Sequence, residues 1–161
     1  MRCIGCGHPA LARWPPPGRI REGGSQEDHV PAVPRPAHGR VIVAYLLGLY
    51  LGDGHIVHGP RDVYVLAIAC SDDWPGLMAA ARQAMAAVMP TSSVCGVKQT
   101  GCTMIKSYSK HWACLFPQHG PGRKHQRKIE LAPWQEVIVR EYPGEFARGL
   151  FHSDGWREPG A

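Results

Sequence analysis

One nine-residue pattern occurs twice in the sequence, and it constrains the fold more than any other feature. The first copy, LLGLYLGDG, spans Leu46–Gly54, and the second, ARGLFHSDG, spans Ala147–Gly155. A constant offset of 101 residues aligns the glycine, leucine, aromatic and aspartate positions of the two copies. Each copy is typical of an apolar helix that ends at Asp-Gly, because glycine readily takes the left-handed conformation that ends helices. The sequence therefore predicts two related helices.

Small residues lie four positions apart in both copies, Gly48 and Gly52 in the first and Gly149 and Ser153 in the second. Residues at i and i+4 share one face of a helix, and small side chains on that face let two helix backbones approach closely. We therefore expect the two helices to pack against each other through these four residues.

Each predicted helix ends on an aspartate, Asp53 in the first copy and Asp154 in the second. A carboxylate in the last turn faces the negative end of the helix dipole, which costs roughly 0.3–1 kcal/mol. Packing the helices side by side would also bring the two carboxylates together, and a divalent cation between them would reverse both penalties. The alternative is two ordinary core helices with solvated Asp-Gly ends. Repetition of the whole pattern favours the metal site.

The repeated pattern resembles the motif of the LAGLIDADG homing endonucleases in their two-motif, single-chain form. Leu46–Gly54 matches that motif well, whereas the second copy has Ala147 where a leucine is usual. The resemblance implies two motif helices at the centre of a pseudo-dimer, each followed by a saddle-shaped antiparallel sheet in the DNA major groove. It also implies that Asp53 and Asp154 hold Mg²⁺ against the scissile phosphates of double-stranded DNA.

Basic residues are unevenly distributed along the chain. The net charge is +5, yet no acidic residue occurs between Asp73 and Glu130. A segment of one sign suits a polyanion, because each neutralised phosphate releases counterions; the alternative is a solvated surface around an alanine-rich helix. The residues that we expect to contact DNA are Arg61, Lys98, Gln99, Lys106, Lys110, Arg123, Lys124, Arg127 and Lys128.

The resemblance further implies a lysine of the sheet near the metals, where it polarises water or stabilises the phosphorane. Lys98 and Lys106 are the candidates for this catalytic role, and a phosphate contact is the alternative for both. His55 and His152 lie beside the two motif ends. Contact with metal-bound water is one role open to these histidines, and an ordinary surface position is the other.

Residues 1–40 differ in composition from the rest of the chain, since they contain seven of its fifteen prolines. Such a segment buries too little apolar surface to offset the entropy of ordering, so we predict a disordered, flexible arm. Within it, Cys3 and Cys6 form a CxxC knuckle that resembles half of a zinc ribbon. A structural zinc needs four ligands, and no second CxxC follows. A zinc site and a remnant of a longer module both remain open.

The rest of the chain divides into a homing-endonuclease-like half-domain at residues 41–142 and a second motif helix with a truncated C-terminus at residues 143–161. Apolar periodicity and turn residues predict helices at 41–52, 71–89, 109–115, 133–141 and from 143 onward. They predict strands at 55–58, 62–71, 93–99 and 102–108. The fold class is therefore α+β, an αββαββα half with an antiparallel sheet plus the second motif helix.

Three further features bound the function. No run of eighteen apolar residues and no signal peptide occur, which predicts a cytoplasmic protein without a membrane segment. The sequence ends at Ala161, shortly after Asp154, so a second sheet does not follow. We therefore expect a truncated homing endonuclease, weakly active or inactive, with a second chain or a missing C-terminal half as its partner. The alternative is a non-cleaving DNA-binding or transcriptional-regulator-like module.

Overall fold

The computed structural model of the protein describes residues 36–154, so the predicted arm up to residue 35, with Cys3 and Cys6, and the segment from Gly155 lie outside the described residues. The elements are α2 (Pro36–Leu51), β1 (Gly54–His58), η1 (Pro60–Asp62), β2 (Tyr64–Ser71), α3 (Pro75–Val88), β3 (Val94–Gln99), β4 (Cys102–Ser109), α4 (Trp112–Leu115), η2 (Lys124–Gln126), α5 (Pro133–Glu141) and α6 (Pro143–Ser153).

The four strands form one antiparallel sheet in the order β1-β2-β4-β3. A two-residue turn joins β3 to β4, and in it Gly101 has a φ of 76°. Glycine reaches this left-handed region without a steric penalty, which explains why a glycine stands at this position. The turn fixes the register of the hairpin, in which Lys98 lies opposite Thr103 and Cys95 lies opposite Lys106.

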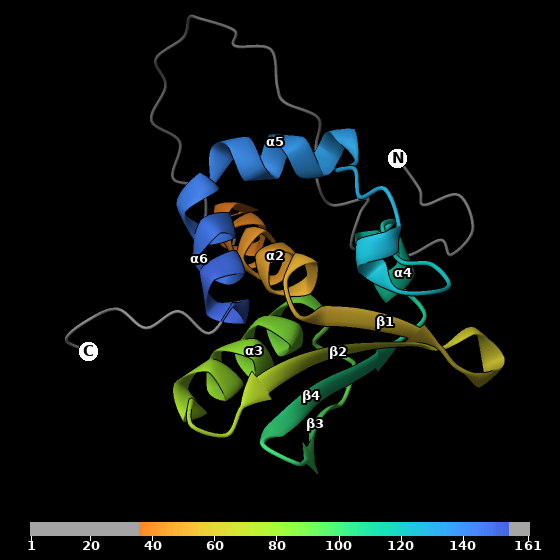
Figure 1. The fold of residues 1–161 in the computed structure, drawn as a ribbon. Helices are drawn as coiled ribbons and strands as arrows, with labels where there is room; N and C mark the ends of the chain where they lie inside the picture. Colours follow the sequence, from red (N-terminus) through yellow and green to blue (C-terminus); the bar gives the residue numbers. More distant parts are fainter. Residues whose placement is uncertain (1–35, 155–161) are drawn as a thin grey trace, which may run out of the picture.

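Among the residues that the structure describes, the helices lie on one face of the sheet, which we call the helix-covered face (Figure 1). We call the other face the open face. Leu66, Ile68 and Ile105 point to the helix-covered face and are fully buried in the core with α3 and α4. Side chains alternate between the faces of a sheet. Val57, Val97 and Tyr108 therefore lie on the open face, where they are among the exposed large apolar residues of the described chain.

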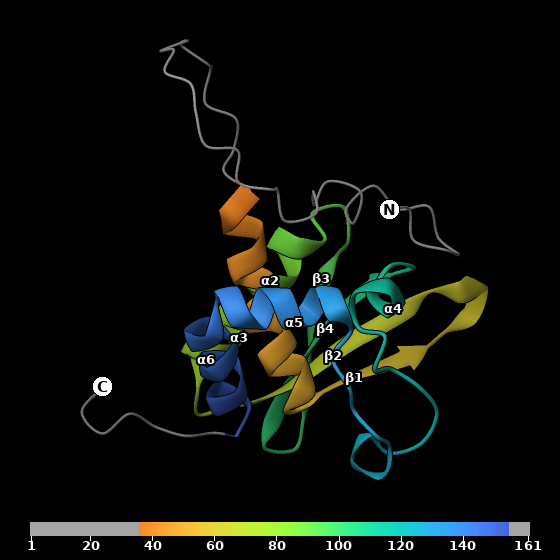
Figure 2. The ribbon, with the colours of Figure 1, turned by 90° about the horizontal axis from the view of Figure 1, so that it is seen from above.

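Helix α2 lies at the centre of the fold, and apolar side chains project from it on all sides. A helix that is apolar all round is stable only when buried, and α2 has neighbours on every side. Leu46, Leu49 and Tyr50 belong to the core above the sheet, and the Tyr50 ring stacks on that of Phe116 at 4.5 Å between centroids. Helix α6 packs alongside α2, and α5 lies across it (Figure 2).

The predicted fold class is confirmed, since the chain is α+β with a four-stranded antiparallel sheet and the expected order of helices and strands. Two local predictions were wrong. Helix α2 begins at Pro36, so the last residues of the predicted arm are helical. Ser71 ends strand β2 and does not cap α3, whose cap residue is Trp74.

Within residues 36–154, no helix is long and apolar enough to cross a membrane.

Candidate functional site

Helices α2 and α6 meet at two glycines whose contacts are reciprocal. A Cβ atom on Gly48 would lie 2.3 Å from the carbonyl oxygen of Phe146, and a Cβ on Gly149 would lie 2.2 Å from that of Tyr45. The positions Tyr45 and Phe146 are themselves 101 residues apart. Exchanging the two helices thus reproduces the contact, so the helices are related by a local two-fold axis.

Two more pairs with the same offset meet across this axis. Arg40 donates two hydrogen bonds to the carboxylate of Glu141, at 3.0 and 2.8 Å. A Cβ on Gly52 would overlap the side chain of Ser153, whose hydroxyl donates to the Leu150 carbonyl at 2.6 Å. The Gly52–Ser153 pair therefore extends the two-fold relation of α2 and α6 to the helix ends beside Asp53 and Asp154. The Arg40–Glu141 pair has the same offset but joins α2 to α5.

The same symmetry brings the two aspartates to one end of the helix pair. Asp53 follows α2, and Asp154 is the residue that ends α6. Partial burial raises the pKa of the Asp53 carboxyl above its ordinary value of 3.8, and the negative charge of Asp154 raises it further. Asp53 therefore loses its proton less readily than a solvated aspartate, as expected where two carboxylates lie close together.

Lys124 contributes a positive charge at this end of the helix pair. Its ammonium donates hydrogen bonds to three backbone carbonyls at the end of α2, those of Tyr50 at 2.7 Å, Gly54 at 2.8 Å and Gly52. It also lies 5.3 Å from the centre of the Tyr50 ring. Burial lowers the pKa of Lys124 to about 8, although the nearby charge of Asp53 acts in the opposite direction.

The loop that carries Lys124 is fixed by a buried glutamine of α5. Gln135 donates to the Leu115 carbonyl at 2.9 Å and accepts a hydrogen bond from the Ala132 amide at 2.9 Å. Gln118 donates to the same glutamine side chain and to the Glu130 carbonyl at 2.8 Å. Buried polar groups with all their partners stabilise one conformation, so these bonds tie both ends of the loop and position Lys124.

The two lysines proposed for catalysis lie on opposite faces of the sheet. Lys106 lies on the open face. Burial lowers the pKa of His55, and the positive charges of Lys124 and Lys106 lower it further. Lys98 lies on the helix-covered face at the edge strand, where it forms a 3.0 Å ion pair with Asp72. Lys106 therefore acts on His55, two residues from Asp53, whereas Lys98 is paired with Asp72.

The other predicted DNA contacts are spread over the surface. Arg61 lies in the β1–β2 turn with a φ of 60°, an uncommon conformation for a residue with a side chain. Lys128 forms a 2.6 Å ion pair with Glu130. Arg127 is partly buried in the loop beside Lys124. The exposed members of the set are Arg61, Lys98, Gln99, Lys110, Arg123 and Lys128.

His152 has a local partner, since its Nδ1 lies 2.9 Å from the hydroxyl of Tyr45. The guanidinium of Arg148 lies over the Tyr45 ring, 4.4 Å from the ring centre, in a cation–π contact. Arg148 also forms a 2.5 Å ion pair with Glu145. Burial raises the pKa of Tyr45 to about 12. His152 is therefore part of the contact between α2 and α6.

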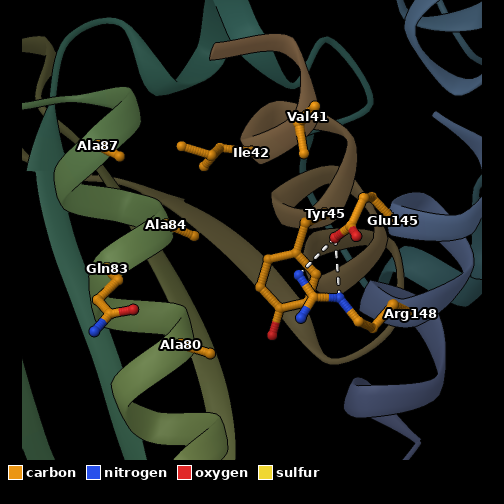
Figure 3. A pocket seen from close by; sticks show the side chains of 9 residues that line it. All are labelled: Val41, Ile42, Tyr45, Ala80, Gln83, Ala84, Ala87, Glu145 and Arg148. Atoms are coloured by element: carbon orange, nitrogen blue, oxygen red, sulfur yellow. Dashed lines mark hydrogen bonds and ion pairs between the residues drawn. The ribbon is translucent and has the colours of Figure 1, made fainter. Parts of the chain in front are cut away.

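A cavity of about 390 Å³ opens between α2, α3 and α6 (Figure 3). Alanines of α3 form one wall, and Tyr45, Glu145 and Arg148 form the opposite wall. Along α2, Tyr45 lies about 12 Å from Asp53 at the usual helical rise. The cavity is therefore separate from the aspartate end. The polar groups of its Tyr45 wall all have partners, since Arg148 is paired with Glu145 and the Tyr45 hydroxyl with His152.

Comparisons with known proteins show a similarity of fold to solved structures and no match of sequence. No family model matches the sequence, and no curated protein matches it. Among solved structures, the fold is similar to that of variants of the homing endonuclease I-DmoI, with a TM-score of 0.43 and 14% sequence identity. The match covers 70% of this chain and 56% of the length of that protein.

Proposed function

We propose that this protein binds double-stranded DNA and hydrolyses its phosphodiester bonds with Mg²⁺ held by Asp53 and Asp154. The observation that carries the proposal is the two-fold pairing of α2 and α6, which brings two carboxylates to one end of a close helix contact. Mutual repulsion makes this arrangement costly unless a cation or a proton compensates it. Hydrolysis of DNA by metal ions at paired carboxylates is the chemistry that such a site suits.

The donor set at this end fits Mg²⁺. Within residues 36–154, no group of three or more His, Cys, Asp or Glu side chains could hold a metal ion. Mg²⁺ does not need such a group, since it prefers oxygen ligands, keeps several waters and is often held by one or two carboxylates plus substrate phosphates. When bound, it would neutralise charge on the scissile phosphate and lower the pKa of a bound water.

The open face of the sheet supplies the remaining parts of the proposed site. His55, Ala67, Lys106 and Cys95 are aligned across β1, β2, β4 and β3 in one row of that face. In this proposal Lys106 takes the role of the phosphate-stabilising lysine, because it points to the open face near the aspartate end. Lys98 contacts phosphate only at the edge, since its ammonium is bound to Asp72.

A partner layer against α6 is part of the proposal. Leu49 in α2 is fully buried above the sheet, whereas Leu150, at the equivalent position of α6, is partly exposed. The local two-fold axis relates these positions, so a layer like the one that covers Leu49 would cover Leu150. We propose that a second chain or a further segment supplies this layer.

A second candidate function is DNA binding without cleavage. Lys124 already brings a positive charge to the Asp53 end, and the described residues contain one sheet, enough for one half of a DNA site. Such a module would hold DNA through the open face of the sheet and leave the phosphodiester intact.

The two functions differ in the fate of supercoiled DNA incubated with Mg²⁺. Endonuclease function predicts nicked circles with the wild-type protein and none with Asp53→Asn or Asp154→Asn. Asp62→Asn, a substitution at the tip of the β1–β2 turn, should nick like the wild type. Intact DNA at protein concentrations that saturate binding would exclude the enzyme and leave the binding module.

DNA binding should depend strongly on salt, because phosphate contacts release counterions. With about five phosphates contacted, log K should fall against log[salt] with a slope of about −4 to −5. Replacing Lys106, Arg123 and Lys128 by glutamine should remove about 0.9 from the magnitude of the slope for each lost contact. Fluorescence anisotropy with labelled duplex DNA at several salt concentrations measures it.

Arg140→Gln provides a charge control for this measurement. Arg140 is exposed on α5, on the far side of the helices from the sheet (Figure 1). Its replacement should leave the slope unchanged. Equal slopes for the triple variant and for Arg140→Gln would show that Lys106 on the open face and Arg123 and Lys128 in the loop do not contact DNA phosphate.

A further inference from the structure

The ammonium of Lys124 occupies a position where backbone carbonyl oxygens converge, and such a position suits a cation. Three carbonyl oxygens, from Tyr50, Gly52 and Gly54, converge on it, and two of these residues flank Asp53 in the sequence. The last carbonyls of a helix carry the negative end of its dipole, so they attract a positive charge. Hard cations such as Mg²⁺ and Ca²⁺ take the same carbonyl and carboxylate oxygens.

Lys124 is also far from these carbonyls in the sequence, 70 to 74 residues away, so its contact ties a separate loop to the end of α2. In that loop, the amides of Gln126 and Arg127 donate to the carbonyls of Arg123 and Lys124, both at 3.1 Å. Lys124 is the first residue of this single turn of helix, so its ammonium joins the turn to the end of α2. Removing the ammonium from its three carbonyls would break this link between α2 and the turn, next to the exposed side chain of Arg123.

We propose that Lys124 and a divalent cation exclude each other at the end of α2, so that metal binding expels Lys124 and releases its loop. The proposal rests on the proposed metal site at Asp53 and Asp154. A divalent ion held by Asp53 would lie beside the ammonium and repel it, and both compete for the same backbone oxygens. Once released, the Lys124 ammonium is free to contact a DNA phosphate. The loop therefore gains this contact only after the metal has bound.

The proposal is tested first by Mg²⁺ titrations of thermal unfolding, with Mg²⁺ alone and no DNA. Lys124→Met removes the competitor, so its apparent Kd for Mg²⁺ should be tighter than that of the wild type, on the order of tenfold. Arg140→Met removes an equal charge from α5 and should bind Mg²⁺ like the wild type. Unchanged or weaker Mg²⁺ binding by Lys124→Met would overturn the proposal.

Hydrogen exchange of the loop amides provides the second test. Saturating Mg²⁺ should speed exchange at Gln126 and Arg127 in the wild type and leave it unchanged in Asp53→Asn, which cannot hold the metal. This comparison needs no Lys124 variant, so it decides the matter even if Lys124→Met does not fold. If Mg²⁺ stabilises the wild type while these amides stay as protected as before, Lys124 stays in place and the mutual exclusion is wrong.

The two proposals fail in different ways. If Mg²⁺ stabilises neither the wild type nor Lys124→Met, the metal site itself is absent and both proposals are overturned. If Mg²⁺ stabilises the wild type and Asp53→Asn removes the effect, the metal site stands, and only the affinity of Lys124→Met and the loop exchange decide the role of Lys124.

Discussion

Gly48→Ala should destabilise the protein by about 3 kcal/mol, because the added methyl group has no room. It would lie 2.3 Å from the carbonyl oxygen of Phe146 and 2.9 Å from the Cα of Gly149. Both are backbone atoms, so no side chain can rotate away and the helices themselves must separate. For a folded part of this size, the melting temperature should fall by roughly 10 °C. Thermal unfolding followed by circular dichroism measures the change.

Gly144→Ala is the matched control because Gly144 lies in α6 itself and an added Cβ would meet nothing within 4 Å. Alanine there should be neutral or slightly stabilising, since glycine costs more conformational entropy in a helix. Gly149→Ala should behave like Gly48→Ala, because the two contacts are reciprocal. Equal melting temperatures for Gly48→Ala and Gly144→Ala would contradict the close contact of α2 and α6.

Parts of the fold were predictable from the sequence where a single sequence pattern determines the local structure. The spacing of Gly48 and Gly149 within two copies of one pattern predicted a close helix contact, and small residues on one helix face allow little else. The strands predicted at 93–99 and 102–108 are separated by two residues, Thr100 and Gly101, which is typical of a hairpin. The start of α2 was predicted too late because Pro36 was counted with a proline-rich arm, although proline is well suited to the first turn of a helix.

The same hairpin held information about the site that the sequence prediction did not use. A two-residue turn at Thr100-Gly101 fixes which residues lie opposite each other. Lys98 is then opposite Thr103 and Lys106 opposite Cys95. Because side chains alternate along a strand, these two lysines must lie on different faces. The register therefore already distinguishes the two lysines by the face of the sheet on which each lies.

The position of Lys124 was not predictable in the same way. Sequence analysis assigned it to a basic loop that contacts DNA, since it lies among Arg123, Arg127 and Lys128. In the structure its ammonium bonds to backbone carbonyls, which every residue has, so this pairing leaves no pattern in the sequence. The packing of the loop against the end of α2 brings them together, and Gln135 holds the two ends of that loop through its bonds with Leu115 and Ala132.

Asp53→Asn should stabilise the metal-free protein, and the gain should depend on pH. Folding raises the pKa of Asp53 above 3.8 through burial and through the charge of Asp154. The folded wild type therefore binds more protons than the unfolded chain in the window just above pH 3.8, and its stability falls as pH rises through that window. Asparagine carries no charge, so the stability difference should grow across the window and stay constant at higher pH.

Mg²⁺ should reverse the order of stability at neutral pH, because the metal relieves the repulsion that the substitution removes. At 100 times its Kd, a ligand that binds only the folded state stabilises it by about 2.7 kcal/mol. The wild type should gain this amount and Asp53→Asn should gain none.

Asp62→Asn is the control. Asparagine tolerates the positive φ of 58° at that turn, and the exposed ion pair of Asp62 with His58 contributes little to stability. Urea unfolding with and without Mg²⁺ measures all three proteins. An equal gain for Asp53→Asn and the wild type would place the bound metal elsewhere and remove the basis for catalysis at Asp53 and Asp154.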